Sequence, residues 1–134
     1  MPGHSFDLRV YYEDTDLAGV VYYANYLKFI ERGRSEFVRV CGVDQVALRA
    51  GRGMVFAVRR LEADYLAPAR FDEMLRVETR LVALTGARIV LDQLVLRGDT
   101  RLFASVVTLA CLTLTGAATR IPADIRQKLG MFQE

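Results

Sequence analysis

Histidine is nearly absent from this chain, since the only one among its 134 residues is His4, close to the N-terminus. Ser-His-Asp and Cys-His machinery, and zinc sites built on histidine pairs, all require an imidazole held inside the fold. Cysteine is also scarce, and Cys41 and Cys111 stand far apart without forming a C-x-x-C pair. The sequence therefore argues against histidine-dependent hydrolysis, zinc and redox chemistry, and it predicts two free thiols in a reducing compartment.

An excess of charge of one sign is missing as well. The 18 Lys and Arg residues against 16 Asp and Glu leave a net charge of +2, too small for a dedicated nucleic-acid-binding protein. The N-terminus lacks a cationic segment followed by an apolar one, so no signal peptide is expected and a cytoplasmic location is predicted. One uncharged run, 102–119, has the length of a membrane span, but it is rich in threonine and β-branched residues. We expect this run to be a strand buried in a sheet, and no membrane span.

What the chain does contain, 52% apolar and 25% charged residues, predicts a single globular domain over residues 1–134. Apolar residues repeat with a period of two, then of three to four, and then of two again, which indicates a strand, a helix and further strands. The predicted elements, in chain order, are a strand over 6–12, a helix over 23–40, a short helix over 45–50, four strands over 54–66, 75–84, 87–96 and 102–115, and a short helix over 122–129.

This order predicts an α+β fold in which an antiparallel β-sheet of about five strands wraps around one long central α-helix. On the first strand, Phe6, Leu8, Val10 and Tyr12 are expected to face inward. The apolar stripe of the long helix runs through Tyr26, Phe29, Ile30, Gly33, Phe37 and Val40.

Two further predictions follow from Gly33 and from the edges of the expected sheet. Glycine costs about 1 kcal/mol relative to alanine inside a helix, so we expect a sheet surface to pass close against Gly33. An open sheet of this size also leaves two edges that need cover. Pairing of edges between two copies predicts a homodimer with a continuous sheet, and packing of outer sheet faces would extend it to a homotetramer.

The most informative segment, 11–26, joins the first strand to the long helix. Asp16 stands just before Gly19 and the helix start, where free backbone N–H groups and the positive end of the helix dipole favour negative charge. The same N–H groups can hold a developing oxyanion on a substrate carbonyl, and the Asp16 carboxylate can attack that carbonyl or activate a water. The simpler interpretation is that Asp16 only caps the turn and the helix.

A calcium loop is the metal alternative for this segment. Asp14, Asp16 and Gly19 match the first, third and sixth positions of the EF-hand pattern. Ala18 and Asn25, however, stand where that pattern needs an oxygen ligand and a bidentate glutamate, and no helix precedes the segment. The sequence therefore predicts no metal site.

Two runs of sequence carry a family resemblance: DTDLAGVVYYANY over 14–26 and YLAPARFD over 65–72. Together they resemble the signature of the hotdog-fold 4-hydroxybenzoyl-CoA thioesterase family, and more narrowly its bacterial branch associated with the Tol-Pal cell-envelope system. The resemblance covers essentially the whole chain. It implies a hotdog fold that hydrolyses acyl-CoA to a free carboxylic acid and CoA at a dimer interface, with CoA as part of the substrate and no separate cofactor.

The resemblance also assigns roles to residues. It places the catalytic carboxylate on Asp16 and the oxyanion donor on the backbone N–H of Tyr23. That position is often histidine in the Tol-Pal-associated branch; a backbone donor survives the change to tyrosine, whereas proton transfer by an imidazole does not. The substrate-binding residues expected in the same motif are Gly19, Val21, Tyr22, Asn25 and Tyr26. For Tyr22, Asn25 and Tyr26, orientation of the turn or packing in the core remains an open alternative.

Other charged residues have weaker claims to a site. Glu31 projects from the helix, where a related hotdog branch uses an acid, but a surface pair with Arg34 or Lys28 is simpler. Arginine forks suit the phosphates of CoA, and the sequence does not choose among Arg59, Arg60, Arg70 and Arg88.

A second class of function is a non-catalytic or weakly catalytic hotdog oligomer that binds acyl carrier protein or a Tol-Pal component through arginine-rich faces. Acyl carrier proteins are acidic, so such binding would weaken steeply with salt. Nucleic-acid binding is a weak third option, because the tyrosines cluster around a carboxylate that repels a phosphate backbone. The sequence does not give the length or shape of the acyl group.

Overall fold

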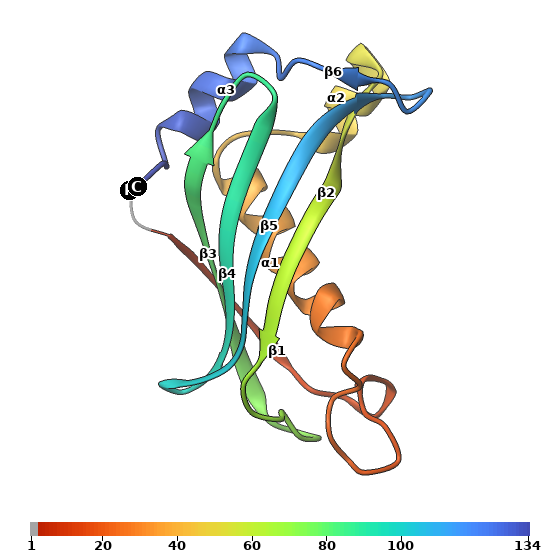
Figure 1. The fold of residues 1–134 in the computed structure, drawn as a ribbon, viewed down its shortest axis with the longest axis vertical. Coiled ribbons are helices and arrows are strands. Elements are labelled where there is room, and N and C mark those ends of the chain that lie inside the picture. Colours follow the sequence, from red (N-terminus) through yellow and green to blue (C-terminus); the bar gives the residue numbers. More distant parts are fainter. Residues whose placement is uncertain (1–2) are drawn as a thin grey trace.

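The computed structural model describes residues 3–134 (Figure 1). Three α-helices, six strands and one 3-10 turn make up this part of the chain. In chain order they are β1 (His4–Arg9), the 3-10 turn (Tyr12–Asp14), α1 (Asn25–Val40), α2 (Gln45–Arg52), β2 (Met54–Tyr65), β3 (Met74–Leu84), β4 (Arg88–Arg97), β5 (Thr100–Thr113), β6 (Ala118–Thr119) and α3 (Ala123–Gly130).

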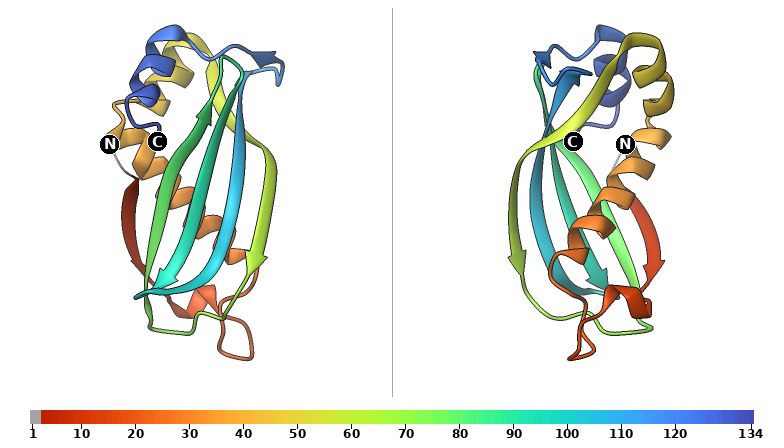
Figure 2. Two further views of the ribbon diagram at one scale, coloured as in Figure 1. Left: turned by 60° about the vertical axis from the view of Figure 1, so that its left-hand side comes forward. Right: turned by 90° about the vertical axis from the view of Figure 1, so that its right-hand side faces the viewer.

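The strands form one antiparallel sheet in the order β1-β3-β4-β5-β2, and the two-residue β6 pairs with β5. The predicted α+β class is therefore confirmed, with a sixth short strand that the sequence did not reveal. α1 is the longest of the three helices and packs mainly on β1, β3 and β4. The expectation of a single long central helix is not confirmed, because two shorter helices accompany α1. Figure 2 shows α2 and α3 at one end of the sheet, and the loops before α1 and after β2 at the other.

Two burial predictions were wrong. β1 ends at Arg9, and Tyr12 lies in the 3-10 turn with 81% of its surface exposed, because the chain leaves the sheet to enter the loop before α1. Val40 is 55% exposed, whereas Val38 is buried. The chain turns back after α1, and Val43, whose N–H donates to the Val38 carbonyl, covers that side of the helix.

A buried polar network holds α1 to the sheet. Gln93 on β4 donates to the carbonyl of Ile30 at 2.8 Å and to the hydroxyl of Thr79 at 2.9 Å. The hydroxyl of Ser105 on β5 in turn donates to the Gln93 carbonyl. Because each buried polar group has a partner, the network fixes the helix position without the cost of a lost hydrogen bond.

Gly33 lies where α1 touches β3, as the sequence predicted. A β-carbon at this position would overlap Val77 Cγ1 and lie 3.1 Å from Val77 Cβ. Gly33→Ala is expected to lower the free energy of unfolding by about 2 kcal/mol, because overpacking of a core contact outweighs the gain in helix propensity. Urea denaturation measures the change.

Gly51 on α2 is the matched control for this substitution, because a β-carbon there meets nothing within 4 Å. Gly51→Ala should raise the stability through helix propensity alone. The double variant Gly33→Ala/Val77→Ala should recover part of the loss. Equal stabilisation by both alanine substitutions would contradict the close contact between α1 and β3.

The uncharged run 102–119 forms β5, a turn and β6, which confirms the strand prediction. Within residues 3–134, no helix combines the length and the apolar character that crossing a bilayer requires. Cys41 and Cys111 are free and buried, as expected. Burial raises the pKa of the Cys41 thiol to about 11, so this thiol stays protonated and unreactive at neutral pH.

Candidate active site

The two sequence motifs lie side by side at the end of the sheet away from α2 and α3 (Figure 2). Val20 pairs with Arg70, and the N–H of Val21 donates to the Ala69 carbonyl at 2.8 Å. The Ala69 N–H in turn donates to the hydroxyl of Tyr26 at 3.0 Å. These contacts bring the loop before α1 against the loop after β2 and make one continuous site from both motifs.

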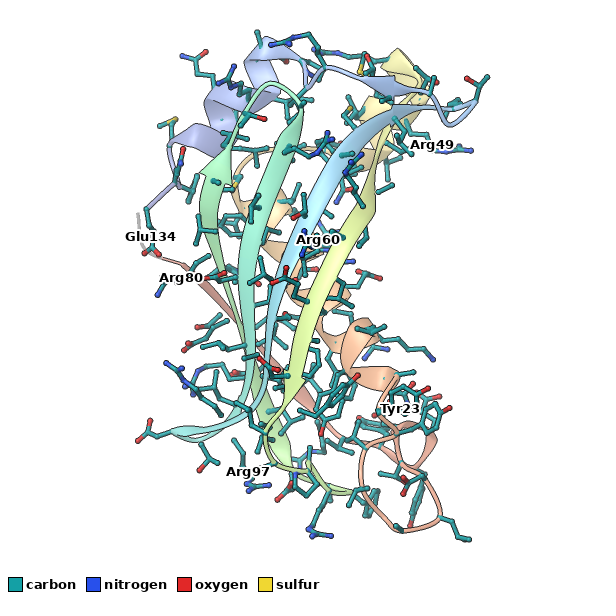
Figure 3. The ribbon with its side chains drawn as sticks, in the orientation of Figure 1. Tyr23, Arg49, Arg60, Arg80, Arg97 and Glu134 are labelled. Atoms are coloured by element: carbon teal, nitrogen blue, oxygen red, sulfur yellow. The ribbon has the colours of Figure 1, made fainter. Side chains whose placement is uncertain are left out.

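An arginine from the β4 end holds the second motif in place. The guanidinium of Arg97, labelled in Figure 3, donates to the Pro68 carbonyl at 3.2 Å and pairs with the Glu73 carboxylate at 3.0 Å. Glu73 also accepts the Arg70 N–H at 2.7 Å. Arg97 and Glu73 therefore hold the loop after β2 at Pro68 and at Arg70.

Asp16 lies at the tip of the first loop, with its side chain exposed. Its Oδ1 atom accepts the N–H of Ala18 at 2.9 Å and that of Val20 at 3.4 Å, while Gly19 closes the turn in the left-handed region at φ 77°. Within residues 3–134, no donor reaches Oδ2 of Asp16. The carboxylate thus has one oxygen that orders its own loop and one that is free to meet a ligand.

The start of α1 is left open. The residue before the helix is Ala24, which supplies no side-chain cap, and no acidic residue lies in the first turn. The N–H of Asn25 donates to the Tyr22 carbonyl, and the N–H of Leu27 donates to the Ala24 carbonyl. The N–H groups of Tyr23 and Ala24 reach no acceptor in the described part of the chain. Uncapped N–H groups at the positive end of a helix favour a negative charge beside them.

Asp14 and Asn25 hold the loop through buried hydrogen bonds. The buried Asp14 carboxylate accepts the N–H of Tyr11 at 2.8 Å, and its backbone carbonyl accepts the side-chain amide of Asn25 at 2.9 Å. Asn25 is itself buried. Of the two roles that the sequence left open for Asn25, the structure therefore supports orientation of the turn.

An aromatic hollow of about 330 Å³ lies beside the open helix start. Tyr26 stacks on Phe103 with ring centroids 5.1 Å apart, and burial raises the pKa of the Tyr26 phenol. Tyr65 packs edge-on against both rings, and its hydroxyl donates to the Tyr23 carbonyl at 2.9 Å. The residues that line the hollow are Val21, Tyr23, Tyr26, Tyr65, Leu66, Ala67 and Pro68.

This arrangement combines a free carboxylate oxygen, unpaired backbone donors and an apolar hollow. The sequence profile of the Thioesterase-like superfamily matches residues 10–129. The acyl-CoA thioesterase YbgC of Haemophilus influenzae is 42% identical over 112 residues, which cover 84% of this chain and 82% of that protein. The acyl-CoA thioester hydrolase YbgC of Escherichia coli O6:H1 is 43% identical over 95 residues, which cover 71% of this chain and 70% of that protein. The chain belongs to the thioesterase-like superfamily.

A solved structure shares the fold of this superfamily member. The probable thioesterase from Bartonella henselae superposes with a TM-score of 0.86 at 41% identity, over 90% of this chain and 99% of that chain. The hotdog-like α+β fold expected from the sequence is thereby confirmed.

The inner face of β2 in this thioesterase-like protein is apolar and only partly covered: Met54 and Phe56 pack against the core, whereas Val58 and Leu61 are exposed. A bulge at Arg59 interrupts the pairing with β5 between Val58 and Arg60. Because of this extra residue, the side chains on the inner face are Met54, Phe56 and Val58 before it and Leu61, Ala63 and Tyr65 after it. Val58 and Tyr65 are about half exposed, at 48% and 50%. β2 therefore presents both an unpaired edge and an apolar face to the surroundings.

Several charged candidates lie elsewhere. The sequence suggested a surface pair between Glu31 and Arg34 or Lys28. In the structure Glu31 instead accepts a hydrogen bond from the Ser35 hydroxyl at 2.7 Å. Arg60 pairs with Glu62 on the outer face of the sheet, and Arg88 begins β4 at the far end. Arg70 is exposed beside Val20, so it lies closer to the candidate site than the other arginines considered for CoA.

Sequence reasoning missed the contribution of Tyr65, Leu66 and Pro68 to the hollow. These residues belong to the second motif, which marked the family but received no role. Their closeness to Tyr23 and Tyr26 depends on a contact between residues 42 positions apart. Among residues 3–134, no group of three or more His, Cys, Asp or Glu side chains is placed to hold a metal ion.

Proposed function

We propose that the protein hydrolyses acyl-CoA thioesters to a free carboxylic acid and CoA. Its superfamily and its identity of 42–45% to curated acyl-CoA thioesterases make it a thioester hydrolase. The observation that carries the proposal is the free Asp16 oxygen in the loop that leads to the uncapped start of α1. A carboxylate and oxyanion donors are sufficient to open an activated carbonyl without histidine.

In the proposed mechanism, the backbone N–H of Tyr23 polarises the thioester carbonyl and stabilises the oxyanion. Asp16 either attacks the carbonyl carbon, so that the CoA thiolate leaves and water then cleaves the mixed anhydride, or removes a proton from an attacking water. Both routes end with the acid and CoA. Support for this assignment comes from the open N–H groups at the helix start and from the Asp16 turn closed by Gly19.

The acyl group is proposed to enter the aromatic hollow. Val21 and Tyr26 form its buried wall, and Tyr22, 47% exposed, stands beside Tyr23 with ring centroids 4.9 Å apart. Arg70, at the mouth of the site, is the proposed partner of the CoA phosphates. No metal or other cofactor takes part in this proposal.

The proposed assembly is a homodimer that pairs β2 of one protomer with β2 of its partner. The partly uncovered apolar face of this strand supports it, because monomers rarely leave both an edge and an apolar face open. A charged hollow of about 380 Å³ on the outer face of the sheet offers a further surface for a homotetramer. We also propose one domain over residues 1–134, a cytoplasmic location, and membership of the Tol-Pal-associated branch of the 4-hydroxybenzoyl-CoA thioesterase family.

The test measures the release of CoA from short-chain, long-chain and aromatic acyl-CoAs. Chromatography is used to detect the CoA, because the thiols of Cys41 and Cys111 could react with a thiol reagent. We expect turnover of at least one ester, and the same rate after exhaustive treatment with EDTA. No turnover of any ester by folded protein would contradict the proposal. A rate restored only by added metal would contradict the metal-free mechanism.

An acyl group on acyl carrier protein is the alternative substrate, because both carriers present the acyl thioester on a phosphopantetheine arm. The exposed Arg70 beside the site supports contact with an acidic carrier. Hydrolysis of acyl carrier protein esters without hydrolysis of CoA esters would favour this alternative. Binding of the carrier without hydrolysis would favour a non-catalytic role, including one with a Tol-Pal component.

A further inference from the structure

A hydrogen bond from β2 reaches the peptide unit next to the proposed oxyanion donor. The hydroxyl of Tyr65, the last residue of β2, donates to the Tyr23 carbonyl at 2.9 Å (Figure 3 labels Tyr23). The ring of Tyr65 is fixed by packing, with its centroid 5.0 Å from that of Phe103 and 5.5 Å from that of Tyr26. The hydroxyl therefore meets the carbonyl from a side chain whose position is already set by the core.

The helix itself does not hold this carbonyl. In a regular α-helix the carbonyl of Tyr23 would accept the N–H of Leu27, four residues later. Here the Leu27 N–H donates to Ala24 instead, at 3.2 Å. Without Tyr65, the peptide between Tyr23 and Ala24 would have no partner on either side and could rotate.

The orientation of this peptide decides where its N–H group points. The bond is trans, so the Tyr23 carbonyl and the Ala24 N–H point in opposite directions. A hydrogen bond accepted by the carbonyl also polarises the N–H of the same peptide. Tyr65 thus fixes and strengthens a free donor, the Ala24 N–H, next to the free Tyr23 N–H.

We propose that Tyr65 is a positioning residue that holds the Tyr23–Ala24 peptide so that the Ala24 N–H serves as a second oxyanion donor beside the Tyr23 N–H. The inference rests on the proposed thioesterase mechanism and extends it to a residue from the second motif. The negative charge that develops on the thioester carbonyl oxygen would then accept hydrogen bonds from two N–H groups at the start of α1. Neither the ring of Tyr65 nor its hydroxyl touches the reacting atoms in this assignment.

The test compares Tyr65→Phe with Tyr65→Leu in steady-state hydrolysis of the best acyl-CoA substrate. Tyr65→Phe keeps the ring and removes only the hydroxyl, and it should lower kcat roughly ten- to thirtyfold with little change in KM. Tyr65→Leu removes the ring as well and should lower kcat at least as much. Tyr12→Phe, which removes a hydroxyl from a side chain 81% exposed, is the matched control and should keep the wild-type kcat.

A second measurement reads the peptide directly and does not depend on activity. In the amide NMR spectrum, Tyr65→Phe should shift the Ala24 N–H signal, because the carbonyl of that peptide loses its hydrogen bond, while Tyr12→Phe should leave it in place. An unchanged Ala24 signal in Tyr65→Phe would overturn the positioning role, whatever the rate. So would a wild-type kcat in Tyr65→Phe combined with a loss in Tyr65→Leu, since the ring alone would then be responsible. Wild-type protein that hydrolyses no thioester would contradict the proposed function, and the NMR shift would then decide whether Tyr65 holds the peptide.

Discussion

Replacement of Asp16 by asparagine is expected to lower kcat for acyl-CoA hydrolysis at least about 1,000-fold, which corresponds to about 4 kcal/mol in the activation barrier. The amide keeps an oxygen that can accept the N–H groups of Ala18 and Val20, so the loop should keep its shape. It cannot attack a carbonyl or remove a proton from water. The loss should therefore appear in turnover and not in folding.

Two further variants separate catalysis from loop structure. Asp99→Asn makes the same chemical change at an exposed acid in the turn between β4 and β5 and should keep wild-type turnover. Asp16→Ala removes the loop hydrogen bonds as well, so it should lose a little stability in addition to the activity. Turnover by Asp16→Asn equal to that of the wild type would remove Asp16 from the mechanism and leave it as the cap of its own turn.

Substitution of Leu61 by glutamate is expected to convert the proposed dimer to monomers and, because the active site is expected at the dimer interface, to lower kcat/KM at least about 100-fold. Leu61 is 38% exposed on the inner face of β2, so a charge there is tolerated by an isolated protomer. In the proposed dimer this face would be buried against the partner subunit, and an unpaired buried charge is strongly destabilising. The molar mass in light scattering and the hydrolysis rate should fall together.

Leu114→Glu is the control for this change, because Leu114 is 57% exposed but follows β5 at the opposite end of the molecule. This variant should remain a dimer with normal activity. A wild-type protein that is already monomeric, or a Leu61→Glu dimer with full activity, would rule out assembly through β2. Circular dichroism verifies that each variant is folded.

Local patterns in the sequence were sufficient for most of the fold. The alternation through Leu75, Val77 and Leu81 predicted β3, and all three side chains are buried on one face. Gly33 predicted a close contact with the sheet because a missing side chain in an apolar stripe has few other causes. Periodicity reports which face of an element is buried, and that information is local.

Features that depend on distant contacts were not predictable in the same way. The sequence gives no sign that β1 stops at Arg9, because Tyr12 continues the alternation even though the chain has left the sheet. The hydrogen bond from the Tyr65 hydroxyl to the Tyr23 carbonyl connects the two sequence motifs. The packing of the whole sheet brings these motifs together, and no local pattern reports it. The position of Asp16 before the helix start indicated a reactive carboxylate, whereas the role of the Tyr23 N–H came only from the family resemblance. Both catalytic roles are predictions that the variants test.

The bulge at Arg59 affects how length differences in β2 should be interpreted. Removal of one residue from a regular strand turns every following side chain to the opposite face. Arg59 is the extra residue itself, so its deletion would let Val58, Arg60 and Leu61 alternate regularly and would keep the apolar face whole. Homologous chains one residue shorter at this point can therefore share the same core and the same pairing edge, and an alignment gap there does not indicate a different assembly.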